Sequence, residues 1–307
     1  MNNFLAAQSK KLISVLSTVI VGTVSLFSSP LLAQTWIPVR GGINFGISGM
    51  ALVEETENGH SFLIAHDNKQ PDQGFLAIVS LQDDHSPNYT PISFPNHETL
   101  PVDLEGLTTV PGMANHYMAM TSFGRVYHFQ LDTENKAISV INIFELPRLK
   151  PGTNLEGFAL QEIDNKLVAV WAHRGQNDDP GVVYWGNLDL DSYTLIPQGF
   201  ASLKVPYPKG NVRHISDIKV DSTGIVYISS ATDNGDNGPF ESAVYGVGVL
   251  TTKNGRIAFK SSSQLIPLYR YHYHKIEAIA FVSGELGGMI LGTDDENMGA
   301  SIWTTLP

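Results

Sequence analysis

The sequence contains no cysteine, so disulfides, thiolate metal sites and cysteine nucleophiles are excluded together. Basic residues are scarce: 19 lysines and arginines face 30 acidic residues, which gives a net charge of −11. No run of Lys and Arg suited to nucleic acid or an anionic membrane occurs along the chain. These absences predict a protein that is stabilised by its core alone and that favours cations over polyanions.

Long apolar runs are also missing, except at the start of the chain. Lys10 and Lys11 precede an apolar run over residues 12–27, and a region of small residues follows at 28–33. This order predicts an export signal over residues 1–33, cleaved after Ala33, and a periplasmic or secreted mature chain. The alternative is an uncleaved membrane anchor, because the run together with Leu31 and Leu32 approaches the roughly 18 to 20 residues that span a bilayer. Cleavage would remove two lysines and take the net charge from −11 to −13.

Five short segments repeat within residues 34–307, which we expect to form a single domain. The segments are ISGMAL at 47–52, LEGLTT at 104–109, LEGFAL at 155–160, ISDIKV at 215–220 and IEAIAF at 276–281. The markers Ser48, Glu105, Glu156, Asp217 and Glu277 are spaced by 57, 51, 61 and 60 residues. This period is that of a propeller blade and is too long for a helical or leucine-rich repeat.

The remaining pattern within each unit also indicates strands. A second apolar stretch follows each segment and ends in a polar turn, and no window shows a clean helical period. We therefore predict an all-β, five-bladed β-propeller, or one with six blades if a unit hides a degenerate repeat. The last unit is one strand short, and residues 35–39 (TWIPV) could complete it, which would close the ring edge to edge.

Acidic markers are expected to meet in the central channel, because the first strand of each propeller blade lines it. The set is Glu105, Glu156, Asp217 and Glu277, with Ser48 as a neutral fifth member. Like charges this close require raised pKa values or a bound cation. The cofactor we expect is calcium (Ca2+), which accepts six to eight oxygen ligands in loose geometry. Alternatively, the carboxylates accept backbone hydrogen bonds and lock neighbouring blades together.

Turns at the channel end supply further candidates. The acidic turn at 293–297 adds Asp294 to the expected metal ligands, and the loop at 232–238 has the composition of a calcium loop without its closing glutamate. His173 and Arg174 lie in an equivalent turn, where an imidazole could transfer protons and a guanidinium could hold a phosphate or carboxylate. Asx-rich turns and exposed histidines also occur without any such role.

The ordered motifs resemble those of the bacterial SdiA-regulated propellers and their phytase-like relatives. Here SGMAL, DLEGLT, NLEGFAL, ISDIKVD and IEAIAF are similar to the SGL, DLEG, LEGLA, SDLA and EGIA segments that open successive blades in that family. The resemblance spans about residues 46–306. It implies an exported propeller with a polar, often calcium-binding channel, and its phytase-like branch implies phosphoester or ester hydrolysis. Ala278 departs from the family glycine, and no phosphate-binding cluster of Lys and Arg is evident.

Three functions fit these observations. The first is an exported, monomeric propeller that binds calcium in its channel and presents a surface to a small ligand or a protein. The second and third are a calcium-dependent phosphoesterase and a lactonase-like hydrolase, each with a channel-bound cation. Phosphate chemistry would need a basic ring, for which the candidates are Arg125, Arg174, Arg213 and Lys275. We favour the binding role, and the sequence leaves open whether the protein is an enzyme.

Overall fold

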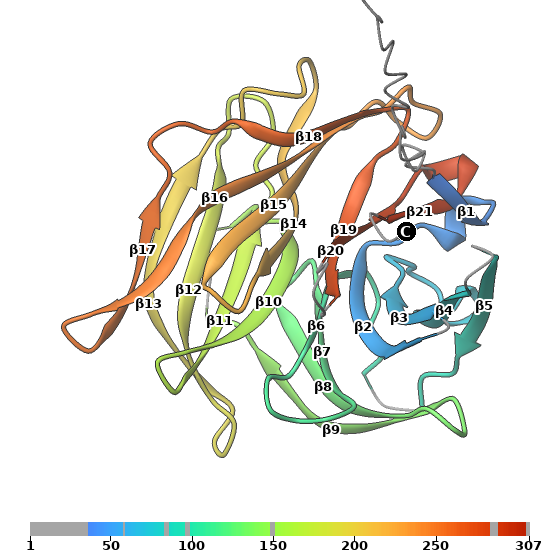
Figure 1. Ribbon diagram of the computed structural model, residues 1–307, viewed down its shortest axis with the longest axis horizontal. Helices are drawn as coiled ribbons and strands as arrows, with labels where there is room; N and C mark the ends of the chain where they lie inside the picture. The colour runs from blue at the N-terminus through green and yellow to red at the C-terminus, as the bar shows by residue number, and fades with distance from the viewer. Residues whose placement is uncertain are drawn as a thin grey trace, which may run out of the picture. The chain divides into compact units, whose positions relative to one another are not determined.

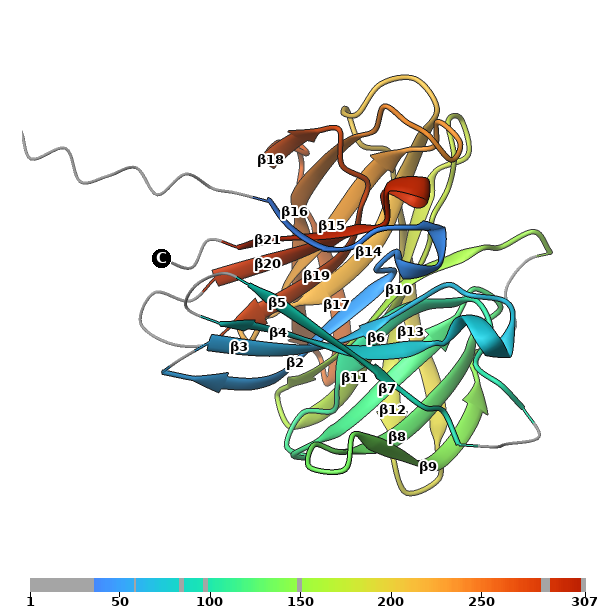
Figure 2. The ribbon, with the colours of Figure 1, turned by 90° about the vertical axis from the view of Figure 1, so that its right-hand side faces the viewer.

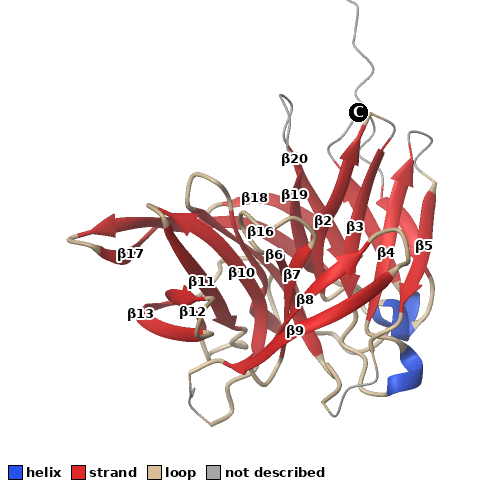
Figure 3. Ribbon diagram, turned by 90° about the horizontal axis from the view of Figure 1, so that it is seen from below, coloured by secondary structure: helices blue, strands red, loops and turns tan. Residues whose placement is uncertain are grey.

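The computed structural model describes residues 36–57, 59–82, 86–95, 99–147, 151–282 and 288–304. All of them lie in Gln34–Pro307, the second of the two units into which the chain divides. The predicted export signal at 1–33 lies outside the described residues. Strands dominate this part of the chain, and its helices are three short 3-10 turns (Figure 3), namely η1 (Ile43–Phe45), η2 (Pro71–Gln73) and η3 (Glu296–Met298). The prediction of an almost all-β protein is confirmed, and no helix in the described ranges has the length and apolarity to cross a membrane.

Five antiparallel sheets succeed one another along the chain, each forming one blade (Figure 1). Blade 1 consists of β2 (Gly49–Thr56), β3 (Gly59–Ala65), β4 (Leu76–Gln82) and β5 (Pro87–Ile92). Blade 2 consists of β6 (Leu104–Thr109), β7 (His116–Thr121), β8 (Arg125–Asp132) and β9 (Ala137–Glu145). Blade 3 consists of β10 (Leu155–Ile163), β11 (Lys166–His173), β12 (Gly181–Asp189) and β13 (Thr194–Leu203). The prediction of five blades, rather than six, is confirmed.

Blade 4 carries one strand more than the others. It consists of β14 (Val212–Val220), β15 (Ile225–Thr232), β16 (Glu241–Lys253), β17 (Arg256–Ser261) and β18 (Pro267–His272). The long β16 pairs with β17 near its end and with β18 near its start, so the outer edge of this blade is shared by two short strands.

Blade 5 joins the two ends of the propeller. It consists of β19 (Ile276–Val282), β20 (Gly288–Thr293), β21 (Ala300–Thr304) and the first strand of the described chain, β1 (Trp36–Arg40). β1 pairs with β21 in antiparallel register, with Trp36 opposite Trp303 and Ile37 opposite Ile302 (Figure 2). The predicted closure by an N-terminal strand is confirmed, and it removes the free edge that β21 would otherwise expose.

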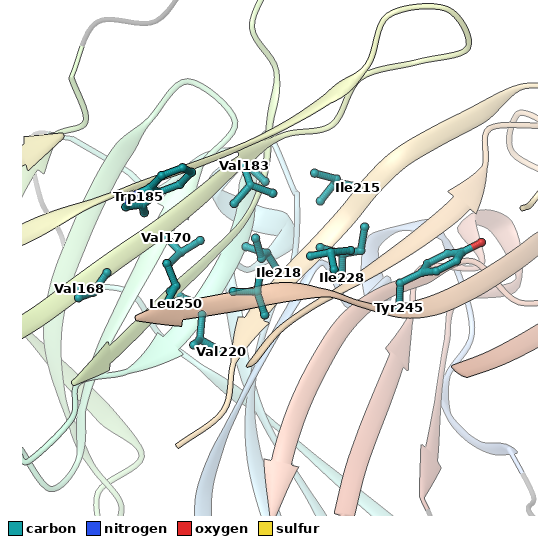
Figure 4. Packing of buried hydrophobic residues seen from close by; sticks show 14 of the residues in the cluster. Val168, Val170, Val183, Trp185, Ile215, Ile218, Val220, Ile228, Tyr245 and Leu250 are labelled. Atoms are coloured by element: carbon teal, nitrogen blue, oxygen red, sulfur yellow. The ribbon is translucent and has the colours of Figure 1, made fainter. Parts of the chain in front are cut away.

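The hydrophobic core lies between neighbouring blades rather than at one centre. Between blades 3 and 4, Val168, Val170, Val183 and Trp185 face Ile215, Ile218, Val220, Ile228, Tyr245 and Leu250 (Figure 4). Residues alternate along each strand, so one face of every sheet packs against the next blade. Each fully buried side chain of this kind contributes about 1.5–3 kcal/mol relative to exposure.

The innermost strands β2, β6, β10, β14 and β19 form a ring of neighbours around the centre (Figure 1). A glycine lets consecutive inner strands approach closely: a Cβ on Gly106 would lie 2.6 Å from the Phe158 nitrogen, and one on Gly157 would lie 2.4 Å from the Ile218 nitrogen. All five strands run in the same sense through the ring, so their starts lie at one end of the channel and their ends at the other.

Candidate functional site at the acidic end of the channel

Three buried glutamates begin the innermost strands of their blades. Glu105 on β6, Glu156 on β10 and Glu277 on β19 are 9%, 2% and 3% exposed. Burial and the charges of Glu156 and Asp67 raise the pKa of Glu105 well above its usual range. Burial also raises the pKa of Glu156 to about 7, with a further contribution from Glu277 and opposition from Arg213. The three markers therefore share one electrostatic site, as their repeat positions predict.

The turns that follow the second strands of the blades bring more charge to the same end. Asp67 follows β3, and burial with the nearby Glu277 raises its pKa to about 6. Asp294 follows β20 and is 4% exposed, and burial raises its pKa well above the usual range although Lys275 opposes the shift. We call the group formed by Asp67, Asp103, Glu105, Glu156, Glu277 and Asp294 the acidic end of the channel.

Blades 3 to 5 neutralise their acids with three cations. Lys275, whose side chain is 2% exposed, lies 3.1 Å from Glu277, 3.3 Å from Asp294 and 2.5 Å from Glu296. Arg213 lies 2.9 Å from Glu277. Burial disfavours both cations, but their acidic neighbours outweigh it and raise the pKa values of Lys275 and Arg213. These residues therefore form a largely buried network of ion pairs.

Glu156 belongs to this network through one of its oxygens. Its Oε1 lies 3.6 Å from Arg174 and 3.9 Å from Arg213. Its buried Oε2 has no hydrogen-bond partner among the described residues. Three of the four basic candidates from the sequence thus converge here, whereas Arg125 forms an ion pair with Glu145 at 2.6 Å elsewhere, on exposed side chains.

Blades 1 and 2 contribute acids without a buried cation. One carboxylate oxygen each from Asp67, Asp103 and Glu105 lies within 4.8 Å of the other two. The described part of the chain offers Lys69 as the ion-pair partner of Asp103, at 3.6 Å, but its side chain is 70% exposed. Ser122 donates a hydrogen bond to Asp103, which fixes one oxygen of that carboxylate. The Glu105 charge is among those that raise the pKa of Arg213 in blade 4, but no salt bridge within 4.0 Å joins Glu105 to a cation of the described ranges.

Asp217 does not join the acidic end, although the sequence analysis placed it there. Its Oδ2 accepts a 2.7 Å hydrogen bond from the backbone of Ile279 in blade 5, and Lys219 contacts both of its oxygens at 3.1 and 3.2 Å. The acid of the ISD segment stands one residue later than the glutamates: Ser216 occupies their position, and Asp217 occupies that of Gly106 and Gly157. Its carboxylate therefore reaches the next inner strand and links blade 4 to blade 5.

Ser48, the neutral marker, also links blades. Its Oγ donates a 2.6 Å hydrogen bond to the carbonyl oxygen of Leu104 at the start of the next inner strand. Two of the five markers, Ser48 and Asp217, therefore have the inter-blade role that was the alternative interpretation of the acidic set.

The two residues expected to be catalytic lie in different surroundings. Arg174 points to Glu156 and so belongs to the acidic end. His173 lies 2.9 Å from the Asn154 carbonyl through Nδ1 and 3.0 Å from Asp179 through Nε2, so both ring nitrogens are occupied by residues outside that group. Among the described residues, the contacts of His173 therefore do not include the carboxylates of the acidic end.

Sequence reasoning missed Asp67 and Asp103 as site residues. Asp103 precedes Glu105 by two positions, as Lys275 precedes Glu277, so both stand at one repeat position. Asp67 lies in the turn that is equivalent to the one holding Asp294. Alignment of these turns would have revealed both residues.

Comparison with solved structures finds propeller enzymes at low sequence identity. A GH43 endo-arabinanase from Bacillus licheniformis matches with a TM-score of 0.51 and 12% identity, over 87% of this chain and 99% of that one. The native arabinanase of Bacillus subtilis has a TM-score of 0.49 and 9% identity, over 88% and 96% of the two chains. No family model and no curated protein matches this sequence. The resemblance to the SdiA-regulated and phytase-like propellers therefore stays a prediction, and the match to the Bacillus licheniformis enzyme shows a shared propeller fold.

Proposed function

We propose that this protein is a cation-dependent binding propeller that holds calcium between Asp67, Asp103 and Glu105. The observation that carries the proposal is the close approach of one carboxylate oxygen each from Asp67, Asp103 and Glu105, within 4.8 Å of one another, with Glu105 nine-tenths buried. A bound divalent cation would offset the burial and the repulsion between carboxylates, which together raise the pKa values of Glu105 and Asp67.

The donor set suits calcium in particular. Three carboxylates offer up to six hard oxygen atoms, and calcium prefers such ligands in a loose geometry, while zinc and copper prefer nitrogen or sulfur. Neither histidine nor cysteine belongs to the group. The neighbouring Arg174 would let a ligand with a carboxylate or phosphate contact the cation and a guanidinium together.

Thermal unfolding of Glu105→Gln with EDTA and with calcium tests the cation site. In EDTA the variant should be more stable than wild type, because it removes a buried, repelled carboxylate. In calcium the order should reverse: wild type gains about 2.7 kcal/mol at a concentration 100-fold above Kd, and the variant lacks that gain.

Glu54→Gln is the matched control, because Glu54 is an exposed acid at the other end of β2. It should follow wild type under both conditions. Equal responses of wild type and Glu105→Gln to calcium would refute the site.

A second candidate function, hydrolysis, rests on Glu156. Its pKa of about 7 and its unpartnered Oε2 are properties of a general acid or base at neutral pH. Because the fold is shared with a GH43 endo-arabinanase, arabinan belongs among the trial substrates, beside the phosphoesters and lactones that the sequence resemblance suggests.

The test is a substrate panel with calcium-loaded wild type and Glu156→Gln. Activity on one class that falls by about 100-fold or more in the variant would support hydrolysis with Glu156 as the proton donor or acceptor. Loss of activity in Glu105→Gln alone would instead assign the chemistry to the cation. If the wild-type protein is inactive on every substrate class, the hydrolase proposal is refuted and the binding function is unaffected.

A further inference from the structure

The far end of the channel holds a second site, which the acidic end does not explain. A cavity of about 780 Å³ lies where the five innermost strands end, and every blade contributes to its wall. Its lining includes Thr109, four residues after Glu105 on β6, and Gln161, five after Glu156 on β10. At about 3.3 Å per strand residue, roughly 13 to 16 Å separates the two ends.

The wall of this cavity mixes apolar and polar residues, with apolar ones in the majority. Its larger aliphatic and phenyl side chains are Met50, Leu52, Val53, Leu160, Val220, Phe281, Val282 and Met289. Tyr227 and Phe281 form an edge-on aromatic pair with ring centres 5.4 Å apart, and both are only half-buried. The volume falls in the range of about 300–1,000 Å³ that is usual for small-molecule pockets.

The one cation among the lining residues, Lys219, and the Tyr227 hydroxyl are paired with other protein groups. The Lys219 ammonium contacts Asp217 at 3.1 and 3.2 Å, and the Tyr227 hydroxyl donates a 3.2 Å hydrogen bond to Asp221. The cavity therefore contains no unpaired positive charge that would attract an anion, among the residues that line it.

The rim adds negative charge. Glu54 and Glu55 are exposed and belong to the lining, and the chain as a whole has a net charge of −11. A negatively charged ligand would meet repulsion here, while a neutral or cationic one would not.

We propose that this cavity, which we call the far-end pocket, binds a small hydrophobic molecule that carries no negative charge. Its apolar body would contact Leu160, Phe281 and Met289, and its aromatic or branched part would lie against the Tyr227–Phe281 pair. The far-end pocket is separate from the proposed cation site, so an experiment that refutes one proposal leaves the other untouched.

Two fluorescent probes with one skeleton test this inference. N-phenyl-1-naphthylamine is neutral, and 1-anilinonaphthalene-8-sulfonate adds a single sulfonate to the same rings. The full chain should bind the neutral probe saturably at one site, and the sulfonate at least about fivefold more weakly. Glu54→Gln should reduce this preference.

Two variants locate the binding. Thr109→Trp and Gln161→Trp place an indole in the pocket from positions that are not buried, and each should weaken binding of the neutral probe by about tenfold or more. Thr251→Trp, at an exposed position of β16, is the matched control and should bind as wild type does. Glu105→Gln should also leave this binding unchanged.

Three outcomes would overturn the proposal: no saturable binding of the neutral probe, equal affinity for the sulfonate, or binding that survives both tryptophans in the pocket. Binding lost in Glu105→Gln but kept in Thr109→Trp would place the probe at the acidic end, which also contradicts the inference.

Discussion

Asp217 and the glutamates occupy adjacent repeat positions, and the position determines whether a side chain contacts the next blade or faces the channel. A side chain at the glycine position points to the next inner strand, and there the Asp217 carboxylate accepts a hydrogen bond from the Ile279 N–H. A side chain one residue earlier faces the other carboxylates. The acidic segments look alike in sequence, yet a shift of one residue changes the direction of the side chain, because strand side chains alternate.

Asp217→Ala should destabilise the protein by about 3–5 kcal/mol, because it leaves the Lys219 ammonium, only 6% exposed, without its partner. The double variant Asp217→Ala/Lys219→Met should recover most of this loss, since it removes the uncompensated charge. The free energy of unfolding in urea measures both changes. If the single variant costs less than about 1 kcal/mol, neither the Asp217–Lys219 ion pair within blade 4 nor the Asp217–Ile279 hydrogen bond to blade 5 contributes the stability expected.

Part of the candidate site could be predicted from the sequence. Glu105, Glu156 and Glu277 share a repeat position, and Asp294 lies in a turn that follows a second strand. The ion pairs of Lys275 and Arg213 could not be predicted, because they join residues from different repeat positions and different blades. The sequence already contained the information that Asp217 does not belong with the glutamates. Alignment of Ile215 with Leu104 and Leu155 places Ser216, not Asp217, at the glutamate position.

At the scale of the strands, β1 has a larger role than its five residues suggest. It completes blade 5, and its Ile37 is 7% exposed in the core cluster shared with blade 1. Trp36 stacks on His274 with ring centres 4.1 Å apart. The chain therefore closes the propeller with the strand farthest in sequence from its partner β21.

Ile37→Ala should lower the free energy of unfolding by about 2–4 kcal/mol, because it opens a cavity at the closure. Ile141→Ala on β9 makes the same chemical change at a position that is 45% exposed, and it should cost less than about 1 kcal/mol. Urea unfolding of both variants provides the comparison. Equal costs would show that closure by β1 is dispensable for stability.

The fold was more predictable than the site because its signals are redundant. Five repeated segments, each followed by a second apolar stretch, gave the number of blades, and the incomplete last unit indicated closure by TWIPV. The extra strand β18 was harder to predict from the sequence. Residues 267–272 alternate like any half-buried strand, and nothing in the local sequence shows that they pair with the start of β16.

For the whole molecule, the distribution of charge along the channel says more about ligand binding than the net charge does. Blades 3 to 5 pair their acids with Lys275, Arg213 and Arg174, while blades 1 and 2 contribute Asp67 and Glu105 and no buried cation of their own. In the far-end pocket the one lysine, Lys219, is already paired with Asp217. The two proposed ligands follow this difference: a cation at one end and a hydrophobic molecule without negative charge at the other.

This asymmetry predicts how stability depends on pH. The folded pKa of Asp67 is raised to about 6, above its unfolded value near 3.9, so the folded state binds more protons than the unfolded state between these values. Its contribution to stability is therefore present at low pH and is lost as pH rises through about 6. Calcium at the proposed cation site would compete with those protons and supply positive charge when the carboxylates ionise.

We therefore expect the gain in melting temperature from calcium, relative to EDTA, to be small at pH 5 and to grow towards pH 7.5. Differential scanning calorimetry at matched ionic strength measures this gap, which is the melting temperature in calcium minus that in EDTA. Asp67→Asn should both reduce the gap and flatten its dependence on pH, because the asparagine neither titrates nor donates a carboxylate oxygen to the cation. Glu54→Gln should retain the wild-type profile. A gap that is constant from pH 5 to 7.5 in wild type would contradict calcium binding by carboxylates with raised pKa values.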